Sequence, residues 1–537
     1  MEKGSVFDLF AAAATRNPQG SFLCVLPETA AAYGIASGEI TYAEALEHVQ
    51  TLSAAYEAAG FGAGQRVGIL VENRPAFFWH WFALNRLGVS LVPVNPDLRA
   101  AEIEYMIGHS EMCAAIVIPS RRQDLENAAA AVGRILPLID VDGTPASLEA
   151  KSTSAQPTSD TECALLYTSG TTGRPKGCVL ANEYFHVCGD WYAQTGGMIA
   201  LRQNSERMIT PLPLFHMNAM ACSTAGMLSV AGCLTFVDRF HPKSWWDSVR
   251  QSRSTILHYL GVMPAMLMAA PETPSDRLED IRFGFGAGVD RQLHAPFEKR
   301  FGFPLIEAWA MTETGSGAVI SAHEEPRHIG SNCFGRTTPQ VEARVVLEDG
   351  SDAPADTPGE LLVRRAGERP RFGFFREYLK DPEATAEAWA GGWFHTGDVV
   401  RRAADGSFHF VDRRKNVIRR SGENISAVEV ESVLQRHPAI KQVACVATPD
   451  AVRGDEVLAL IVPHEKPADE TALAREIAEF CLSRLAYYKA PGWTSFVTSI
   501  PLTGTQKIQR GALKQLAQDR MEAGLCHDTR KIKKRSA

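Results

Sequence analysis

Residues 167–177 read YTSGTTGRPKG, and this stretch decides the fold. It holds four aliphatic hydroxyls, three glycines and one lysine, Lys176, and it follows the apolar run CALL at residues 163–166. The apolar run predicts a buried strand. Glycines let backbone N–H groups turn toward an anion, the hydroxyls add donors, and Lys176 adds a positive charge. We therefore predict a strand that leads into a phosphate-binding loop.

The loop is not the commonest nucleotide loop, because the order G-x-x-x-x-G-K-[ST] is absent from it. A flexible surface turn is the plain alternative for a stretch rich in Ser, Thr and Gly. The density of donors, the preceding strand and the lysine favour phosphate binding. The residues expected to contact the phosphates are Thr168, Ser169, Gly170, Thr171, Thr172, Gly173 and Lys176.

Size and composition narrow the class of protein. A chain of 537 residues is too long for one core, so we expect at least two domains. The net charge of −7 argues against a nucleic-acid partner. The eleven cysteines are scattered without a C-x-x-C pair, which predicts reduced core residues. The start lacks the pattern of a signal peptide, and no apolar run reaches the roughly 18 residues of a membrane helix, so we expect a cytoplasmic protein without an integral membrane segment.

The pattern of apolar residues predicts an α/β fold. Helix-like periodicity at residues 43–59 and 77–87 alternates with strand-like runs at 66–71 and 89–94, which indicates parallel sheets with crossover helices. Short strands from about residue 335 predict a small β-rich lobe. We expect a large N-terminal domain at residues 1–413, a charged linker near residues 412–415, and a small mobile α+β C-terminal domain at residues 414–537. The final basic run, RKIKKR at residues 530–535, is expected to be a solvated tail.

Four further stretches follow the loop in a fixed order. They are EAWAMTETG at residues 307–315, GWFHTGD at 392–398, VDRRKNVIRRSGENISAVEVE at 411–431 and IPLTGTQKIQR at 500–510. Together with the loop, they resemble the motifs of the adenylate-forming (AMP-binding) enzymes, and the third is most similar to the crotonobetaine/carnitine-CoA ligase branch. The resemblance implies an acyl-CoA synthetase that joins a carboxylic acid, as a small-molecule substrate, to coenzyme A through an acyl-adenylate, using ATP and Mg²⁺. We also expect a homodimer.

The chemistry of these motifs suits ATP. A carboxylate such as Asp398 can accept both hydroxyls of a ribose, although an acid in a Thr-Gly-Asp turn is more often a cap. Glu313, beside Thr312, suits Mg²⁺, which binds through one or two carboxylates and substrate phosphates. Lys507 can offset the repulsion between an attacking carboxylate and the phosphates. The expected catalytic residues are Lys176, Thr312, Glu313 and Lys507.

The resemblance assigns several further roles. It implies that Trp309 stacks on adenine, that Arg413 contacts the ribose and that Lys415 is the hinge of the C-terminal domain, although a solvated linker would look similar. Gln506 stands where the family usually has glycine before the lysine. The other residues expected at ATP are Gly286, Ala308, Ala310 and Met311, and those expected at coenzyme A are Ser421, Gly422 and Glu423.

The sequence defines adenylate formation better than it defines the second half-reaction or the identity of the carboxylic acid substrate. Transfer to a carrier protein, luciferase-type oxidation and a catalytically silent nucleotide-binding homologue are alternatives. His216 occupies the place where enzymes for amino acids carry an acid beside an aromatic residue, which disfavours an α-amino acid. Ala310 replaces the tryptophan that blocks the pocket of short-chain enzymes, so we expect a medium-length or bulky acid. The expected acyl pocket comprises His216, Met217, Val262, Met263, Gly288 and Ala310.

Overall fold

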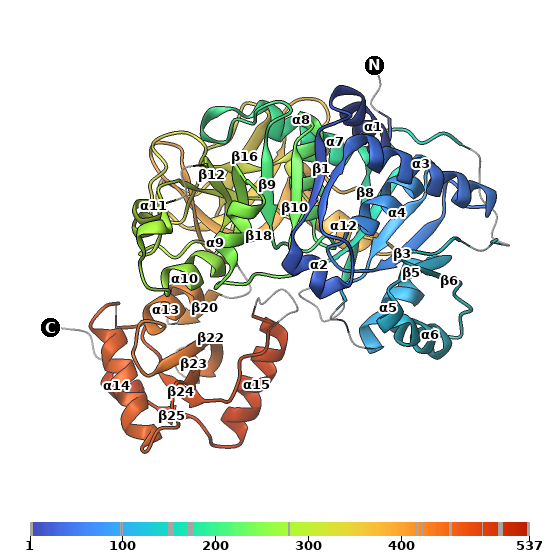
Figure 1. Ribbon diagram of the computed structural model, residues 1–537. Helices are drawn as coiled ribbons and strands as arrows, with labels where there is room; N and C mark the ends of the chain where they lie inside the picture. The colour runs from blue at the N-terminus through green and yellow to red at the C-terminus, as the bar shows by residue number, and fades with distance from the viewer. Residues whose placement is uncertain are drawn as a thin grey trace.

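The computed structural model describes residues 4–96, 98, 100–145, 147–148, 155–168, 175–277, 280–413, 417–420, 423–450, 454–485, 487–502 and 508–533. Three sheets form the N-terminal body, and a fourth forms the C-terminal domain, which lies below the body in orange and red (Figure 1). Within the described residues, no helix combines the length and the apolar composition that a membrane crossing requires.

The first sheet carries the phosphate-loop hairpin at its edge. Its strands, in spatial order, are β6 (Leu138–Asp140), β5 (Ala114–Val117), β3 (Arg66–Leu70), β4 (Ser90–Pro93), β7 (Glu162–Thr168) and β8 (Lys176–Ala181). The strands from β6 to β7 are parallel, and β8 returns antiparallel to β7. Nearly every residue of the parallel strands is buried, because helices cover both faces of the sheet.

The second sheet is larger and also mainly parallel. Its order is β14 (Ile320–Ser321), β13 (Leu305–Trp309), β12 (Phe283–Ala287), β11 (Ile256–Leu260), β9 (Arg207–Thr210), β10 (Cys233–Phe236), β1 (Ser21–Val25) and β2 (Gly38–Thr41). Only the two edge strands, β14 and β2, pair antiparallel. The carboxyl ends of its parallel strands therefore meet at one edge, where ligands of such sheets bind.

The third sheet is the predicted β-rich lobe. Its strands are all antiparallel, in the order β15 (Cys333–Gly335), β19 (Phe408–Arg413), β18 (Phe394–Arg402), β17 (Gly359–Arg365) and β16 (Val341–Val346). One hydrophobic cluster joins all three sheets and includes Phe10, Val67, Phe236 and Leu361. The N-terminal body is consequently one packed unit that fixes the three sheets relative to one another.

Helices cover these sheets and begin at clear signals. At the start of α1, Ser5 and Asp8 form a reciprocal capping box. The helices of the body are α1 (Val6–Arg16), α2 (Pro27–Tyr33), α3 (Tyr42–Ala58), α4 (Pro75–Arg86), α5 (Ala100–Ser110), α6 (Arg122–Ala131), α7 (Asn182–Gln194), α8 (Thr224–Val230), α9 (Trp245–Gln251), α10 (Val262–Met268), α11 (His294–Phe301) and α12 (Pro382–Ala388). The predicted helices at 43–59 and 77–87 are confirmed as α3 and α4, and the strands at 66–71 and 89–94 as β3 and β4.

The C-terminal domain has its own sheet and cores. Its strands are β20 (Val417–Arg420), β21 (Glu423–Ser426), β22 (Ile440–Asp450), β23 (Gly454–Pro463), β24 (Trp493–Phe496) and β25 (His527–Asp528), and its helices are α13 (Ala427–Leu434), α14 (Glu470–Leu482) and α15 (Arg510–Glu522). Neighbouring residues of β23 face opposite sides, so Ala459 joins one apolar cluster and Leu458 the other.

Two sequence-based predictions are wrong in this region. Asp412 is not in a solvated linker: it lies in β19, is 1% exposed and accepts a hydrogen bond from Ser426 Oγ (3.0 Å). The basic run is not a solvated tail at Arg530 and Lys533. Lys533 is buried and pairs with Glu456, which also accepts from Arg420 Nε (2.8 Å). The buried carboxylate needs these cations, because an isolated charge is costly to bury.

The prediction of reduced core cysteines is confirmed. All eleven cysteines are free, and nine of them are buried. Burial raises the pKa of Cys163 and Cys178 well above the usual range of a thiol, which keeps them protonated and unreactive.

Candidate active site

The phosphate-loop hairpin holds Lys176 at the start of β8. Thr168 and Lys176 pair directly across the hairpin, so the ends of the loop are fixed beside each other. Lys176 Nζ lies 4.8 Å from the centre of the Tyr378 ring and 3.9 Å from Asp381 Oδ2. The loop residues Ser169, Gly170, Thr171, Thr172 and Gly173 lie outside the described residues, so their phosphate contacts stay a prediction.

Glu313 lies close to the same tyrosine. It follows β13, is 7% exposed, and its Oε1 accepts a hydrogen bond from the Tyr378 hydroxyl (2.9 Å). Burial, and then the charge of Glu313, raise the pKa of Tyr378 far above its usual range, so the hydroxyl remains a donor. Thr312 precedes Glu313, and its carbonyl accepts from the Tyr184 hydroxyl (2.9 Å). Both the side chain of Glu313 and the backbone before it are thus held by buried tyrosines.

Glu313 can hold a metal only together with a ligand. The described residues include no group of three or more His, Cys, Asp or Glu side chains that could bind a metal ion. Mg²⁺ does not require such a group, because it commonly binds through one or two carboxylates, water and the phosphates of the substrate. A single buried carboxylate that shares its tyrosine partner with Lys176 fits that manner of binding.

Asp398 is placed by an irregularity in β18. The prediction of a Thr-Gly-Asp turn is wrong: Thr396, Gly397 and Asp398 lie inside the strand, where its register against β17 shifts. Gly397 has a φ of 67°, a left-handed conformation that favours glycine. Asp398 is 3% exposed, and its Oδ2 accepts a hydrogen bond from Trp309 Nε1 (2.8 Å). Its backbone also pairs with Arg413 on β19, whose side chain is not among those described.

The loops that follow β11 and β12 lie where the acyl pocket is predicted, and we call this region the acyl side. A side chain on Gly261 would collide with the carbonyl of Gly288, so the two loops touch backbone to backbone. The carboxylate of Glu307, on β13, accepts hydrogen bonds from the backbone N–H groups of Gly288 (3.1 Å) and Val289 (2.9 Å). Burial raises the pKa of Glu307. Gly286 is buried, whereas Gly288 and Ala310 are exposed at the ends of neighbouring strands.

His216 and Met217 lie in the loop after β9. Asn73 fixes this loop by donating to the carbonyl of Leu212 (3.1 Å) and accepting from the N–H of Leu214 (2.9 Å). Both His216 and Met217 are half-buried, and the Phe215 ring lies beside that of His216.

A π-helical turn (Asn218–Ser223) follows His216 and Met217. Below it, the buried His258 bonds to Ser223 Oγ (2.8 Å) and to the Tyr192 hydroxyl (2.9 Å). Burial lowers the pKa of His258 to about 3, so the imidazole is neutral at physiological pH. The turn is therefore tied to the central sheet by an uncharged hydrogen-bond network.

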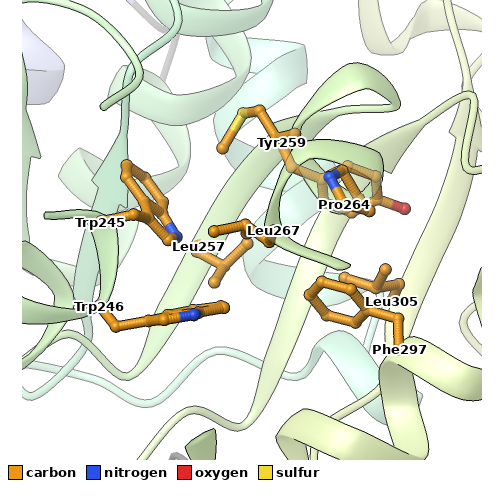
Figure 2. A pocket seen from close by; sticks show the side chains of 9 residues that line it. Trp245, Trp246, Leu257, Tyr259, Pro264, Leu267, Phe297 and Leu305 are labelled. Carbon is orange, nitrogen blue, oxygen red and sulfur yellow. The ribbon is translucent and has the colours of Figure 1, made fainter. Parts of the chain in front are cut away.

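Met263 lies in a small apolar cavity beneath α10. Figure 2 shows the rings and aliphatic side chains that surround this space, among them Trp245, Trp246 and Phe297. Met263 lines the cavity and is 3% exposed. Leu305 and Tyr259 also line it, and the Tyr259 hydroxyl reaches Glu307 Oε1 (3.3 Å) on the other side. Met263 is thus a buried core residue that lines this cavity, and its predicted contact with the acid stays a prediction. The side chain of Val262 is not among those described.

Most predicted residues of the C-terminal domain cannot be placed. Lys415, Ser421, Gly422 and Lys507 lie outside the described residues, and Glu423 is described only as the start of β21. The domain does contact the N-terminal body, because Ser432 Oγ on α13 donates to Asp290 Oδ2 (2.8 Å). Asp290 follows the loop that contains Gly288, so the C-terminal domain lies near the site.

Sequence reasoning missed Tyr378, Asp381 and Glu307. Asp381 and Pro382 are a recognisable start signal for α12, since Asp caps helices and Pro suits the first position. No local pattern shows that the preceding segment pairs with β8, which is a long-range contact. Glu307 opens a motif that was recognised, but its contacts to another loop are visible only in the fold.

Comparisons with known proteins agree with this geometry. The model of the AMP-binding enzyme family matches residues 24–379, and that of the AMP-binding enzyme C-terminal domain matches residues 429–507. A crotonobetaine/carnitine–CoA ligase of Salmonella typhi is 31% identical over 494 residues, covering 89% of this chain and 93% of that protein.

Solved structures share the fold. ATP-bound MatB from Rhodopseudomonas palustris has a TM-score of 0.79 and 24% identity, covering 97% of this chain and 99% of MatB. The anthranilate CoA ligase AuaEII in complex with anthranoyl-AMP has a TM-score of 0.82 and 23% identity, covering 98% and 99%. The chain therefore belongs to the AMP-binding enzyme family.

Proposed function

We propose that this AMP-binding enzyme, an ATP-dependent acyl-CoA ligase that forms AMP, activates a medium-length or bulky carboxylic acid. The observation that carries the ATP-dependent part of the proposal is that Lys176 on β8 and Glu313 in the turn after β13 share one partner, while Asp398 on β18 bonds to the last residue of β13. Each is held by a named partner: Lys176 and Glu313 by Tyr378, and Asp398 by Trp309. A cation, a carboxylate fit for a metal and a diol acceptor together match the parts of ATP.

The first half-reaction follows from these charges. Lys176 and the loop N–H groups bind the phosphates, and Asp398 accepts from the ribose hydroxyls while Trp309 borders the adenine. Glu313 would hold Mg²⁺, which when bound neutralises charge on the phosphates. The carboxylate of the acid then attacks the α-phosphorus, a bond to pyrophosphate breaks, and Lys507 offsets the charge that accumulates between the two anions. Thr168, Gly286, Ala308, Met311 and Arg413 complete the proposed ATP site.

The second half-reaction requires the C-terminal domain, which we assign to residues 414–537, with residues 1–413 as the adenylation domain. Support comes from β19, which ends at Arg413 within the third sheet, and from the separate cores beyond it. Rotation about Lys415 would bring Ser421, Gly422 and Glu423 to the site, where the thiol of coenzyme A displaces AMP from the acyl-adenylate.

The nature of the acid is inferred from the acyl side. Ala310 and Gly288 are exposed and carry little or no side chain, so they leave room beyond the reacting carboxylate. His216 and Met217 would border this room. The Salmonella typhi relative is named for crotonobetaine and carnitine, so these two compounds belong in the screen alongside linear and aromatic acids.

The proposal is tested by AMP formation with a panel of carboxylic acids, with and without coenzyme A. A CoA ligase gives sustained AMP release only when acid and coenzyme A are both present. Exchange of pyrophosphate without stimulation by coenzyme A would favour transfer to a carrier protein. Absence of any acid-dependent reaction would indicate a silent nucleotide-binding homologue.

We further propose a cytoplasmic enzyme. The free, mostly buried cysteines suit a reducing compartment. The homodimer stays a prediction from the sequence, and sedimentation analysis of the purified protein checks it.

A further inference from the structure

The segment that carries Tyr378 is attached to the phosphate-loop hairpin. Backbone hydrogen bonds join Arg376 N to Val179 O (2.8 Å), Val179 N to Glu377 O (3.0 Å) and Leu379 N to Gly177 O (2.8 Å). These bonds continue the sheet beyond β8, so the backbone of Tyr378 is fixed relative to the strand that begins with Lys176. Tyr378 itself is 8% exposed, and its ring also packs against Phe375 with 4.7 Å between centroids.

Tyr378 contacts two charged groups through two different parts of its side chain. The hydroxyl donates to Glu313 Oε1 (2.9 Å), and the face of the ring lies 4.8 Å from Lys176 Nζ. A hydrogen bond to a carboxylate fixes its direction, and an ammonium group is attracted to the face of an aromatic ring. One residue therefore orients the carboxylate and the cation of the proposed ATP site at the same time.

Asp381 offers Lys176 a competing partner. Its Oδ2 lies 3.9 Å from Lys176 Nζ, while its Oδ1 accepts from Ala384 N (3.0 Å) and so caps α12. Both side chains are partly exposed, so the pair is weak and can exchange with a stronger anion. A phosphate chain, with several negative charges, is such an anion.

We propose that Tyr378 is a positioning residue for ATP: its hydroxyl aims Glu313 at the metal and its ring holds Lys176 for the phosphates, while Asp381 is the counter-ion that Lys176 leaves when ATP binds. This inference rests on the proposed ATP-dependent function. It predicts two separable effects on the affinity for ATP. The hydroxyl of Tyr378 should contribute only when Mg²⁺ is present, whereas the ring and Asp381 should contribute with or without Mg²⁺.

The experiment is calorimetric titration of the full chain with ATP, without acid or coenzyme A, once in EDTA and once in excess Mg²⁺. Tyr378→Phe keeps the ring and removes the hydroxyl. We expect an unchanged Kd for ATP in EDTA. The ratio of the Kd in EDTA to the Kd in Mg²⁺ should fall about fivefold or more relative to the wild type. Tyr378→Leu also removes the ring, and we expect a further two- to fivefold weakening, about the size of a cation–π contact, under both conditions.

Asp381→Asn keeps the helix cap and removes the charge. We expect it to tighten ATP binding about two- to fivefold in EDTA, the size of a partly exposed ion pair. Tyr42→Phe is the matched control, because the Tyr42 hydroxyl is buried and donates to Gly232 O (2.8 Å) far along the chain from the site. It should leave both Kd values unchanged, and thermal melting of each variant confirms that the fold is kept.

Several outcomes would overturn the inference. If Tyr378→Phe weakens ATP binding equally in EDTA and in Mg²⁺, the hydroxyl has a merely structural role and the inference is wrong. The inference is also contradicted if Mg²⁺ tightens ATP binding as much in Tyr378→Phe as in the wild type. Weaker ATP binding in Asp381→Asn would contradict the role of Asp381. If the wild-type protein does not bind ATP at all, the proposed function fails instead, so the two failures are distinguishable.

Discussion

On the proposed nucleotide side of the site, charged side chains are held by other side chains, whereas the proposed acyl side presents backbone and small residues. Glu313 is fixed by Tyr378 and Asp398 by Trp309. On the acyl side, Gly261 and Gly288 touch through their backbones, and Glu307 holds that loop by its N–H groups. The difference suggests that substitutions on the nucleotide side remove activity, whereas those on the acyl side change which acid is used.

Loss of Lys507, the proposed lysine of the adenylation step, should have the largest effect. We expect Lys507→Ala to lower acyl-adenylate formation by about 100- to 1000-fold, because a charge that stabilises the transition state is removed. Thioester formation from preformed acyl-adenylate should be largely retained. The two half-reactions are assayed separately, and an equal loss in both would indicate misfolding and refute this role.

A substitution at the proposed hinge tests whether the C-terminal domain rotates between the two half-reactions. Lys415→Pro should spare adenylation and slow thioester formation on the order of 100-fold, because proline fixes φ and small misplacements cost that much in rate. Single-turnover assays of each half-reaction measure the two steps. Normal overall turnover would show that the chain does not pivot at this residue.

A substitution of Asp398 tests the proposed nucleotide side at a residue whose side-chain contacts are described. Asp398→Asn should raise the KM for ATP about tenfold or more, because an amide replaces a charged acceptor of the ribose hydroxyls. Asp356→Asn is the matched control: Asp356 is an exposed acid of the same lobe that pairs with Arg401. Equal kinetics for both variants would remove Asp398 from the ATP site.

Ala310 tests the acyl side, where the effect should be one of preference. In the wild type, each additional buried CH₂ should raise kcat/KM about fourfold until the pocket is full, following roughly 0.8 kcal/mol per CH₂. Ala310→Trp should fill the space and shift preference toward acetate and propionate. A chain-length series measures this, and a wild type that already prefers acetate would contradict the open pocket.

The sequence predicted most of the architecture, because apolar periodicity and capping signals act locally. The strand before the phosphate loop and the helices α3 and α4 were predicted in this way. It failed where distant segments decide: Asp398 was assigned to a turn, although pairing with β17 and β19 keeps it in a strand. Lys533 was assigned to a solvated tail, although it is buried and pairs with Glu456, which lies far from it along the chain.

The site was predicted less completely than the fold. Motifs identified Lys176, Glu313 and Asp398, since each lies in a distinctive local pattern. Tyr378 lies in no such pattern, and its proposed role rests on its pairing with β8 and on its contact with Glu313 in the turn after β13. Residues that position catalytic groups depend on tertiary contacts, which a single sequence does not display.

Acid-dependent exchange of labelled pyrophosphate into ATP, measured without coenzyme A, tests the central claim most directly. The reaction reports only acyl-adenylate formation, at the site that we propose contains Lys176, Glu313 and Asp398. We predict exchange that requires an acid and Mg²⁺ and that falls about tenfold or more in Asp398→Asn at limiting ATP. Exchange that proceeds unchanged in Asp398→Asn, or none with any acid while the folded protein binds ATP, would contradict the account.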